Sequence, residues 1–352
     1  MFRSKSTLLK TFYGHTRLVT SIDYSTFDCN QFICSGSDDC TVRLWDIEEN
    51  NKIQLFHGHS SVNCVKYSPY HYYNNSCTVI CFSSNDKTIR FWDIKGGQKL
   101  RLLDGHTGAV CGIEFSPFNG GRYLCSGSCD NTIRLWDVET FKSLHAFNGH
   151  TSAWCVDISP LQSNNNNKNE SSDIGVIGGN GYTICSGSWD KTIRIWDIET
   201  TKQTIVFKRH EGCVLSVKYG PNELGNIGCS NTILSGSTDE SVRLWDIRSG
   251  QQIQVFNGHT DNVNAVEYSP LVTKHSVGNS NVICSGSQDN TIRFWDIRSN
   301  YGELHVIKRY KEDIGITCLK FLKLKKDKKS NNHGCDINLC YGSNDNTISI
   351  WG

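Results

Sequence analysis

The chain has 352 residues, of which 20% are charged, and its formal net charge is +1. A balanced charge gives no overall field that favours nucleic acid or an anionic membrane, so either partner would require a local patch. No run of about 18 apolar residues is present, and residues 1–10 lack the apolar stretch of a secretion signal, which argues against membrane insertion and export. We therefore expect a cytoplasmic or nuclear protein, or one found in both compartments.

The first predicted element is a strand over residues 7–13, and seven copies of one unit follow it without linkers. The copies span approximately residues 14–57, 58–104, 105–148, 149–208, 209–257, 258–308 and 309–352. Each copy carries Asp six positions before Trp: Asp39/Trp45, Asp86/Trp92, Asp130/Trp136, Asp190/Trp196, Asp239/Trp245, Asp289/Trp295 and Asp345/Trp351. A period of roughly 40–60 residues indicates a repeat architecture, so we predict one closed domain over residues 1–352.

Each copy predicts four short strands separated by turn residues. In the third copy these are the β-rich runs 109–115, 123–128, 132–137 and 143–147. A four-stranded unit with apolar positions on both faces cannot bury itself alone, so the copies must pack face to face around a ring. The sequence therefore predicts an all-β fold, a β-propeller of seven blades.

Gly-His pairs precede the first strand of five copies, and Trp-Asp pairs close most copies. With these pairs, essentially the whole chain resembles the WD40 repeat family. The resemblance implies that His, Ser, Asp and Trp of one blade form a buried hydrogen-bonded tetrad. The complete sets are His15/Ser35/Asp39/Trp45, His106/Ser126/Asp130/Trp136, His150/Ser186/Asp190/Trp196, His210/Ser235/Asp239/Trp245 and His259/Ser285/Asp289/Trp295.

Two blades depart from the family pattern. Blade two has Phe82 where Ser is expected and keeps the other three members, His59, Asp86 and Trp92. Blade seven has Tyr310 for His and Tyr341 for Ser, and keeps Asp345 and Trp351. We expect the hydrogen-bond networks of these two blades to be weaker or rewired.

The two ends of the chain predict how the ring closes. The last copy stops at Gly352, directly after its third strand, so blade seven lacks an outer strand of its own. Residues 8–13 match the residues that lead into the later Gly-His pairs. We therefore predict that the N-terminal strand completes the C-terminal blade. The residues before Leu8 fit neither the N-terminal helix of Gβ-type subunits nor an F-box.

The copies differ in length between their first and second strands. The predicted inserts are 69–78, 160–182, 221–231, 270–281 and 322–335. Loops between first and second strands all emerge on one face of a propeller, so the opposite face carries none of these inserts, and we call it the trimmed face. Segment 163–173 is polar and low in complexity, as a solvated insertion is. We expect the lysines within 323–329 to form a solvated loop. The alternative is contact with nucleic acid phosphates or with an acidic protein, and this loop is the one place where the sequence offers nucleic acid contact.

Six of the seventeen cysteines recur at one strand position, which Leu234 takes in blade five: Cys34, Cys81, Cys125, Cys185, Cys284 and Cys340. A position shared by Cys and Leu is a core position, where a free thiol behaves as a small hydrophobic group. Reduced thiols agree with a reducing compartment. The pairs Cys77/Cys81 and Cys125/Cys129 have C-x3-C spacing, but no paired histidines lie near them in the sequence, so we predict no zinc site. We predict no other metal and no cofactor either.

Two tryptophans, Trp154 and Trp189, stand outside the repeat pattern. Both belong to blade four and are predicted to lie near the trimmed rim of the central channel. In WD40 proteins that read peptides, including the propeller subunit of trithorax-type histone methyltransferase complexes, these two classes of position commonly carry aromatic contacts. The residues predicted to complete a peptide site are Leu215, Asn63, Asn262, Asn264 and Gln288. The alternative is that both indoles pack against each other or against the adjacent blade.

No Walker loop, GxGxxG, H-E-x-x-H or G-x-S-x-G motif is present. The recurring His and Asp residues indicate scaffolding, because an active site is normally assembled once. We therefore predict a non-catalytic, monomeric propeller that binds peptide segments or partner subunits within a multiprotein complex. The alternatives are a histone-tail or chromatin-complex reader and a subunit of an RNA-processing complex. An enzyme with a metal in the channel is the rival from another class.

Overall fold

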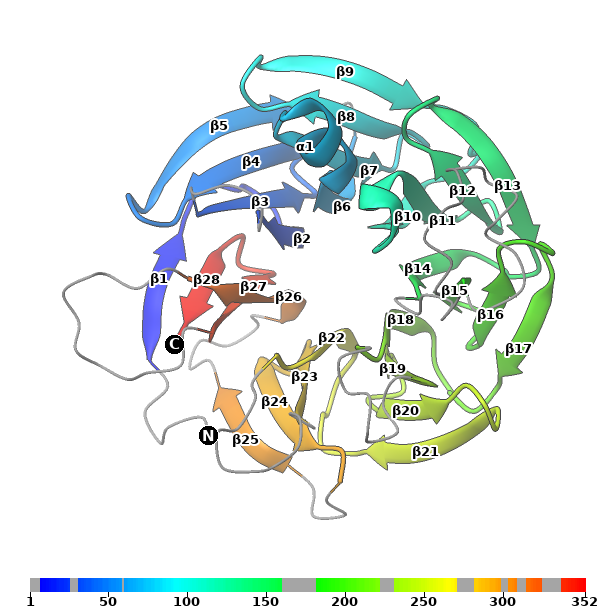
Figure 1. Ribbon diagram of the computed structural model, residues 1–352. Helices are drawn as coiled ribbons and strands as arrows, with labels where there is room; N and C mark the ends of the chain where they lie inside the picture. The colour runs from blue at the N-terminus through cyan, green and yellow to red at the C-terminus, as the bar shows by residue number, and fades with distance from the viewer. Residues whose placement is uncertain are drawn as a thin grey trace.

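The structure is a computed structural model that describes residues 7–25, 31–58, 60–159, 182–221, 231–270, 282–298, 303–308, 315–324 and 337–352. Seven four-stranded antiparallel sheets surround a central channel, as Figure 1 shows. Each sheet is one blade, with its first strand at the channel and its last strand at the outer edge (Figure 1). The predicted all-β, seven-bladed propeller is confirmed.

The blades follow one another in chain order. Blade one contains β2 (Val19–Tyr24), β3 (Phe32–Ser37), β4 (Thr41–Asp46) and β5 (Asn51–His57). Blade two contains β6 (Val62–Tyr67), β7 (Val79–Ser84), β8 (Ile89–Asp93) and β9 (Gln98–Leu103). Blade three contains β10 (Val110–Phe115), β11 (Tyr123–Ser128), β12 (Thr132–Asp137) and β13 (Lys142–Asn148). Blade four contains β14 (Ala153–Ile158), β15 (Thr183–Ser188), β16 (Ile193–Asp197) and β17 (Gln203–Phe207).

The remaining blades complete the ring. Blade five contains β18 (Val214–Tyr219), β19 (Thr232–Ser237), β20 (Val242–Asp246) and β21 (Gln251–Phe256). Blade six contains β22 (Val263–Tyr268), β23 (Val282–Ser287), β24 (Thr291–Asp296) and β25 (Glu303–Lys308). Blade seven contains β26 (Ile316–Lys323), β27 (Ile337–Ser343), β28 (Ile348–Trp351) and the N-terminal strand β1 (Leu8–Phe12).

The ring is closed by pairing between the two ends of the chain. Strand β1 runs antiparallel to β28, with Phe12 opposite Ile348. Two backbone bonds extend this pairing beyond the strands: Thr7 N–H donates to Gly352 O at 3.0 Å, and Gly352 N–H donates to Thr7 O at 3.2 Å. The predicted closure, in which the N-terminal strand completes the C-terminal blade, is confirmed.

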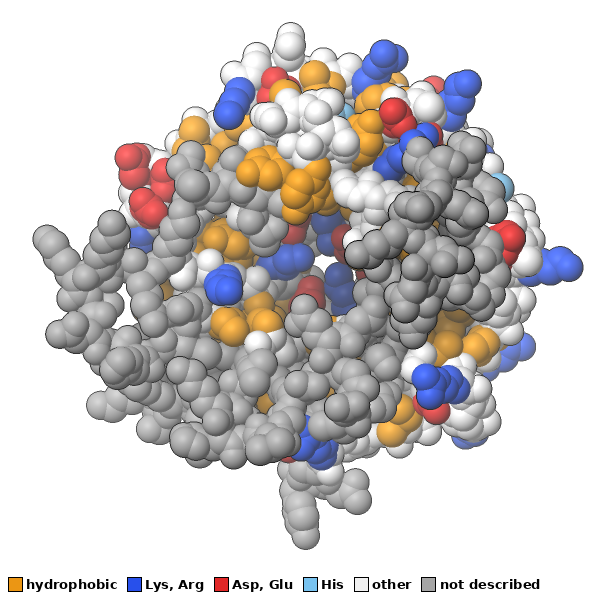
Figure 2. Space-filling view, in the orientation of Figure 1, with side chains coloured by type: hydrophobic (Ala, Val, Ile, Leu, Met, Phe, Trp, Pro, Cys, Tyr) orange, Lys and Arg blue, Asp and Glu red, His pale blue; other side chains and the backbone are white. Residues whose placement is uncertain are grey.

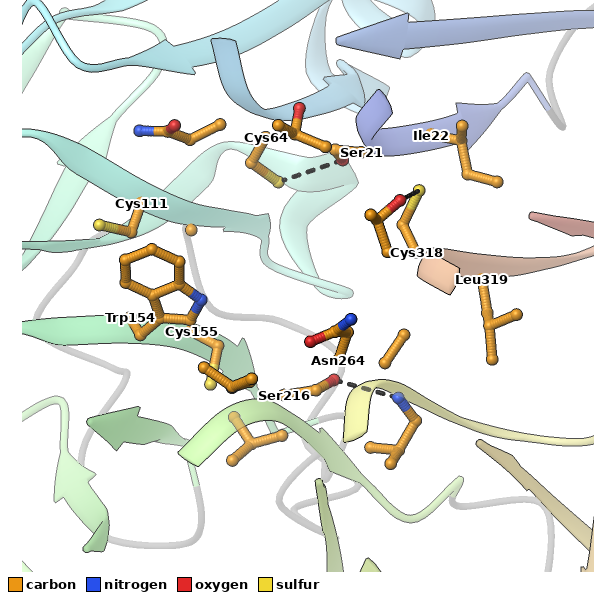
Figure 3. Close-up of a pocket in the computed structure, with 18 of the residues that line it drawn as sticks. Ser21, Ile22, Cys64, Cys111, Trp154, Cys155, Ser216, Asn264, Cys318 and Leu319 are labelled. Atoms are coloured by element: carbon orange, nitrogen blue, oxygen red, sulfur yellow. Dashed lines mark hydrogen bonds between the residues drawn. The ribbon is translucent and has the colours of Figure 1, made fainter. Parts of the chain in front are cut away.

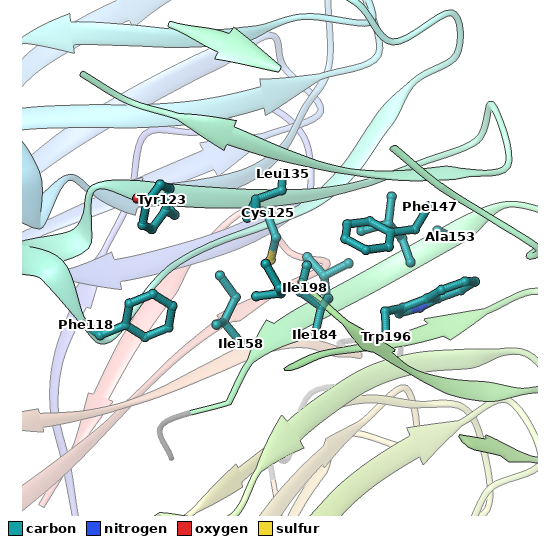
Figure 4. Close-up of a cluster of buried hydrophobic side chains, with 12 residues drawn as sticks. Phe118, Tyr123, Cys125, Leu135, Phe147, Ala153, Ile158, Ile184, Trp196 and Ile198 are labelled. Carbon is teal, nitrogen blue, oxygen red and sulfur yellow. The ribbon is translucent and has the colours of Figure 1, made fainter. Parts of the chain in front are cut away.

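The hydrophobic core lies between neighbouring blades. Figure 4 shows one cluster, in which Cys125 and Phe147 of blade three meet Ile184 and Trp196 of blade four. The six recurring cysteines and Leu234 are all fully buried, as expected for a core position. Every cysteine within the described ranges is a free thiol. The blades therefore hold together through side chains that face the next blade.

The glycine between the two serines of the second strand serves this packing. A Cβ atom on Gly36 of β3 would lie 2.6 Å from Cγ1 of Val62 in the next blade, which is too close for real atoms. The residue at this position has to be small because the adjacent inner strand passes directly over it.

The predicted insert at residues 69–78 begins with the helix α1 (Pro69–Asn75), which was not predicted from the sequence. Proline is preorganised for the first helical turn, and Ser76 ends the helix in the left-handed conformation with φ of 51°. The short 3-10 helix η1 (Asn119–Gly121) lies against α1. The other four predicted inserts fall mostly outside the described residues, as do segment 163–173 and the lysines at 325–329.

Among the described residues, no helix is long and apolar enough to cross a membrane.

Candidate functional site

Each complete tetrad forms one directional hydrogen-bond chain inside its blade. In blade three, Trp136 Nε1–H donates to Ser126 Oγ at 2.8 Å. Ser126 Oγ lies 2.7 Å from His106 Nε2, and His106 Nδ1 lies 2.8 Å from Asp130 Oδ2. Because the serine accepts from the indole, its own hydrogen is available to Nε2, and Nδ1–H is left to donate to the carboxylate. A neutral histidine with its proton on Nδ1 completes this chain of donors and acceptors.

The same three contacts recur in four more blades, and their distances lie within about 0.1 Å of those in blade three. The residues are His15, Ser35, Asp39 and Trp45; His150, Ser186, Asp190 and Trp196; His210, Ser235, Asp239 and Trp245; and His259, Ser285, Asp289 and Trp295. A hydroxyl two residues after the aspartate donates to its second oxygen in each blade. All polar groups of the tetrad are thus used within the fold.

The two divergent blades are rewired. In blade two, Phe82 is fully buried and Trp92 Nε1–H is buried without a hydrogen-bond partner in the described part of the chain. Asp86 accepts from the Thr88 hydroxyl and from Arg90, as Asp190 of blade four accepts from Thr192 and Arg194. In blade seven, Trp351 Nε1–H donates to Tyr341 Oη at 3.2 Å, so the phenol takes the place of the serine. His59 and Tyr310 lie outside the described residues.

Burial and hydrogen bonding shift the titration of the tetrads. Burial lowers the pKa of the histidine below 6.5 in four blades, against the opposing effect of the aspartate: His15, His106, His150 and His210. Burial alone would raise the pKa of Asp130, but hydrogen bonds from Thr132, from the Thr107 backbone and from His106 lower it to about 2. The pKa values of four equivalent carboxyls are lowered as well: Asp39, Asp190, Asp239 and Asp289.

These shifts predict that the propeller loses stability as the pH falls below about 6.5. Below that pH the histidines of the unfolded chain become protonated, whereas the buried rings of the folded protein stay neutral. Below about pH 4 the aspartates likewise become protonated in the unfolded chain before they do in the folded protein. In both cases the unfolded state binds more protons than the folded state, so the free energy of unfolding decreases as the pH decreases. Burial raises the pKa of Asp157, which has the opposite effect on stability, but this one group does not offset the combined effect of the tetrad histidines and aspartates. Urea unfolding at a series of pH values measures the effect, and a constant midpoint down to about pH 4 would contradict it.

The two additional tryptophans form a stacked pair at the mouth of the channel. Trp154 is the second residue of β14, and Trp189 directly follows β15. Their ring centroids lie 5.4 Å apart with an interplanar angle of 29°, and 52% of Trp189 is exposed. The stack therefore satisfies the packing interpretation and leaves one indole face open to solvent.

The corresponding two positions meet in other blades as well, and we call them a rim pair. Asn63 Nδ2 donates to Asn85 Oδ1 at 2.8 Å in blade two, and Asn264 Nδ2 donates to Gln288 Oε1 at 3.5 Å in blade six. In blade three, the sulfurs of Cys111 and Cys129 lie 3.4 Å apart. The propeller geometry thus brings these two side chains together repeatedly, whatever their chemistry.

A central cavity of about 410 Å³ opens beside the rim pairs. Figure 3 shows Cys111 of β10 and Trp154 of β14 on its wall. Of the residues predicted to form a peptide site, five line the cavity: Trp154, Leu215, Asn63, Asn264 and Gln288. Trp189 and Asn262 are not part of this lining: Trp189 stacks on Trp154, and the Asn262 backbone oxygen accepts from Gln288 N–H at 2.9 Å.

The second residue of the inner strand has a further role that the sequence did not reveal. Asn63 and Asn264 also donate to backbone oxygens of the next blade, Val110 O at 2.9 Å and Ile316 O at 2.8 Å. Thr20 and Thr317 make the equivalent bond with their hydroxyls. The amide donors of Asn63 and Asn264 are therefore engaged between blades, and within the described residues their amide oxygens remain as acceptors. Blades three to five carry Cys111, Trp154 and Leu215 instead, which form an apolar arc.

Every inner strand carries a charged residue at the same position, and this belt was not predicted. Five of the seven side chains line the central cavity, whereas Asp23 and Asp157 are buried and accept from backbone N–H groups of the next blade. In chain order they are Asp23, Lys66, Glu114, Asp157, Lys218, Glu267 and Lys320. Lys218 Nζ lies 3.3 Å from Glu114 and 3.7 Å from Glu267, and Lys320 Nζ lies 3.2 Å from Asp23. Figure 2 shows basic and acidic side chains gathered in the central opening. Neighbouring charges alternate in sign except between Glu114 and Asp157, so most of them are neutralised across blades.

Comparison with known families agrees with this geometry. The model of the "WD domain, G-beta repeat" matches residues 6–46, 50–93, 97–137, 141–197, 201–246 and 250–296, which is most of the chain. The chain belongs to the WD40 repeat family. WD40 propellers typically act as scaffolds for protein interactions and are generally non-catalytic. In the described part of this WD40 ring, no group of three or more His, Cys, Asp or Glu side chains is placed to hold a metal ion.

Individual relatives of this WD40 chain match it over short stretches only. "Probable E3 ubiquitin ligase complex SCF subunit sconB" of Aspergillus terreus is 45% identical over 58 residues, which is 16% of this chain and 8% of the relative. "Guanine nucleotide-binding protein subunit beta" of Zea mays is 45% identical over 58 residues, or 16% of this chain and 15% of the relative. "Protein SUPPRESSOR OF PHYA-105 1" of Arabidopsis thaliana is 39% identical over 56 residues, 16% of this chain and 5% of the relative. The chain thus spans less than a sixth of the length of each of these relatives.

Proposed function

We propose that this WD40 propeller is a non-catalytic subunit that binds an extended peptide segment of another protein on its trimmed face. The observation that carries the proposal is the Trp154–Trp189 stack, with 52% of Trp189 exposed at the mouth of the channel. Five of the repeat tryptophans are buried in their blades instead: Trp45, Trp136, Trp196, Trp245 and Trp295. An indole held open to solvent on a rigid ring is the kind of residue that anchors a partner.

The surroundings of the stack favour an apolar anchor side chain on the partner. Cys111 and Leu215 continue the apolar arc on either side of Trp154, where other blades carry hydrogen-bonding side chains. Asn63 and Asn264 lie further around the same cavity, and their amide oxygens, which accept no hydrogen bond from the described residues, provide acceptors for backbone N–H groups. A rigid wall of this kind costs little conformational entropy on binding.

The relatives support an assembly role without identifying the partner. Two of them are, by their names, a subunit of an SCF ubiquitin ligase complex and a subunit of a guanine nucleotide-binding protein. Both names describe parts of larger complexes. We propose the same general role, that of a subunit in a larger complex, for the present chain. The matches are too short to assign a partner of these relatives to this chain.

The double substitution Trp154→Ala with Trp189→Ala tests the site. We expect the variant to keep its thermal unfolding transition, because Trp189 is exposed and neither residue belongs to a tetrad. Loss of a hot-spot anchor weakens binding by at least about 2 kcal/mol, or about 30-fold. Quantitative affinity purification with mass spectrometry compares the proteins retained by the two forms, and purified partner then gives the dissociation constants.

The control variant is Tyr73→Ala, which removes an aromatic side chain of α1 that is 63% exposed. Because α1 connects the first and second strands of blade two, Tyr73 lies on the face opposite to the tryptophan stack. It is expected to retain the wild-type partners. If the double tryptophan variant retained the same partners with unchanged affinity, the site would be wrong.

A further inference from the structure

We propose that Cys111 and Cys129 form a reversible disulfide, which makes this rim pair a redox-modification site for low-molecular-weight disulfides such as oxidised glutathione. The sulfurs lie 3.4 Å apart, so a shift of roughly 1.4 Å brings them to bonding distance. Cys129 is exposed, whereas only 8% of Cys111 is exposed. This proposal goes beyond the peptide site and does not depend on it.

The backbone keeps the two thiols together. Cys129 N–H donates to Ala109 O at 2.9 Å, which fixes the residue against the start of β10. Cys111 lies at a register shift between Val110 and Gly112, where β10 bulges against β11. The equivalent residues of other blades touch in the same way, as the Asn63–Asn85 hydrogen bond and the Trp154–Trp189 stack show. The contact between the sulfurs therefore follows from the repeat geometry.

The surroundings distinguish the roles of the two thiols. Ser152 Oγ lies 3.5 Å from Cys129 Sγ and donates to it. The Cys111 thiol points to Ala109 O at 3.7 Å, and burial raises its pKa. Cys129 is thus the residue that meets an oxidant in solution, and Cys111 is the thiol that resolves the intermediate.

The chemistry is a two-step exchange. The Cys129 thiolate attacks one sulfur of oxidised glutathione, forms a mixed disulfide and releases one glutathione thiolate. Cys111 then attacks the Cys129 sulfur, the second glutathione leaves as a thiolate, and the proton of Cys111 passes to solvent or to that leaving group. Overall, two protein thiols are oxidised to one disulfide and one oxidised glutathione is reduced to two glutathione thiols. Such bonds are transient in a reducing compartment, as redox-sensing disulfides are.

The test is equilibration of the purified full-length chain in a series of glutathione redox mixtures, followed by acid quenching, alkylation and peptide mass spectrometry. We expect Cys111 and Cys129 to lose alkylation together and to appear in one cross-linked species lacking two hydrogen atoms. The effective concentration of one thiol towards the other should exceed the ~1 mM of a short flexible link.

Two controls keep the result interpretable. The variant Cys111→Ser should stop at the mixed disulfide of Cys129 with glutathione, because no resolving thiol is present. Cys213, which has no thiol contact within the described structure and lies 3.7 Å from the Trp189 backbone oxygen, is the internal control and should not form a cross-link.

The proposal would be overturned by either of two results. One is wild-type protein in which Cys129 accumulates the glutathione adduct to the same extent as in Cys111→Ser. The other is alkylation of both cysteines that persists in every mixture in which Cys213 is already modified.

Discussion

Deletion of residues 1–13 is expected to abolish cooperative folding of the propeller or to lower its thermal midpoint by more than about 10 °C. The deletion removes β1, the outer strand of blade seven, and leaves β28 as an unpaired edge. It also removes Phe12, which is 2% exposed and packs 5.5 Å from the Trp45 ring of blade one. Loss of one buried phenylalanine costs about 3–5 kcal/mol, and domains have only about 5–15 kcal/mol of stability in total.

Two matched variants separate this effect from a general effect of truncation. Deletion of residues 1–6 keeps β1 and the Thr7–Gly352 backbone bonds, so it should unfold like the wild type. The substitution Phe12→Ala keeps the strand, and its thermal midpoint should lie between the midpoints of the two deletion variants. Calorimetry or circular dichroism gives the midpoints. An unchanged midpoint after deletion of residues 1–13 would contradict the closure of the ring by β1.

The substitution Trp136→Ala is expected to cost about 3–5 kcal/mol of unfolding free energy, the usual value for emptying a buried aromatic site. Trp136 is 1% exposed and packs in the cluster between blades two and three. Its indole N–H is also the first donor of the tetrad. Both the packing and the hydrogen bond are lost, and urea unfolding measures their sum. A cost below about 1 kcal/mol would contradict a structural role.

The hydrogen bond can be isolated by a comparison between blades. Trp136→Phe removes the indole donor and leaves Ser126 Oγ without it, whereas Trp92→Phe removes an N–H that has no partner within the described residues. Both changes lose a similar ring volume. We expect Trp136→Phe to cost about 1 kcal/mol more than Trp92→Phe. Equal costs would show that the bond to Ser126 contributes nothing.

The fold could be predicted almost completely because the repeat determines it. A unit that cannot bury both faces alone has to stack, and the missing outer strand of the last copy predicts the closure by residues 8–13. The shared use of Cys and Leu at one position likewise predicts the buried thiols. The helix α1 was missed because residues 69–75 carry no apolar period, and its start depends on Pro69 and on packing against η1.

The candidate site was predicted less completely, because its contacts join different copies of the repeat. The sequence separated Trp154 and Trp189 from the structural tryptophans, but their stacking depends on how β14 and the turn after β15 meet. The bond from Asn63 to Val110 O crosses from one blade to the next, so no pattern within a copy predicts it. The belt of channel charges could have been found by aligning the seven inner strands, where every copy has a charged residue at the same position.

Site-specific photo-crosslinking tests the central claim, that this ring is a scaffold whose trimmed face binds its partner. A photoreactive phenylalanine analogue is placed at position 189 in one protein and at position 73 in another. We expect position 189 to cross-link a specific peptide of a partner protein, and position 73 on the opposite face to give no such product. Cross-links to the same partner from position 73 and none from position 189 would contradict the account.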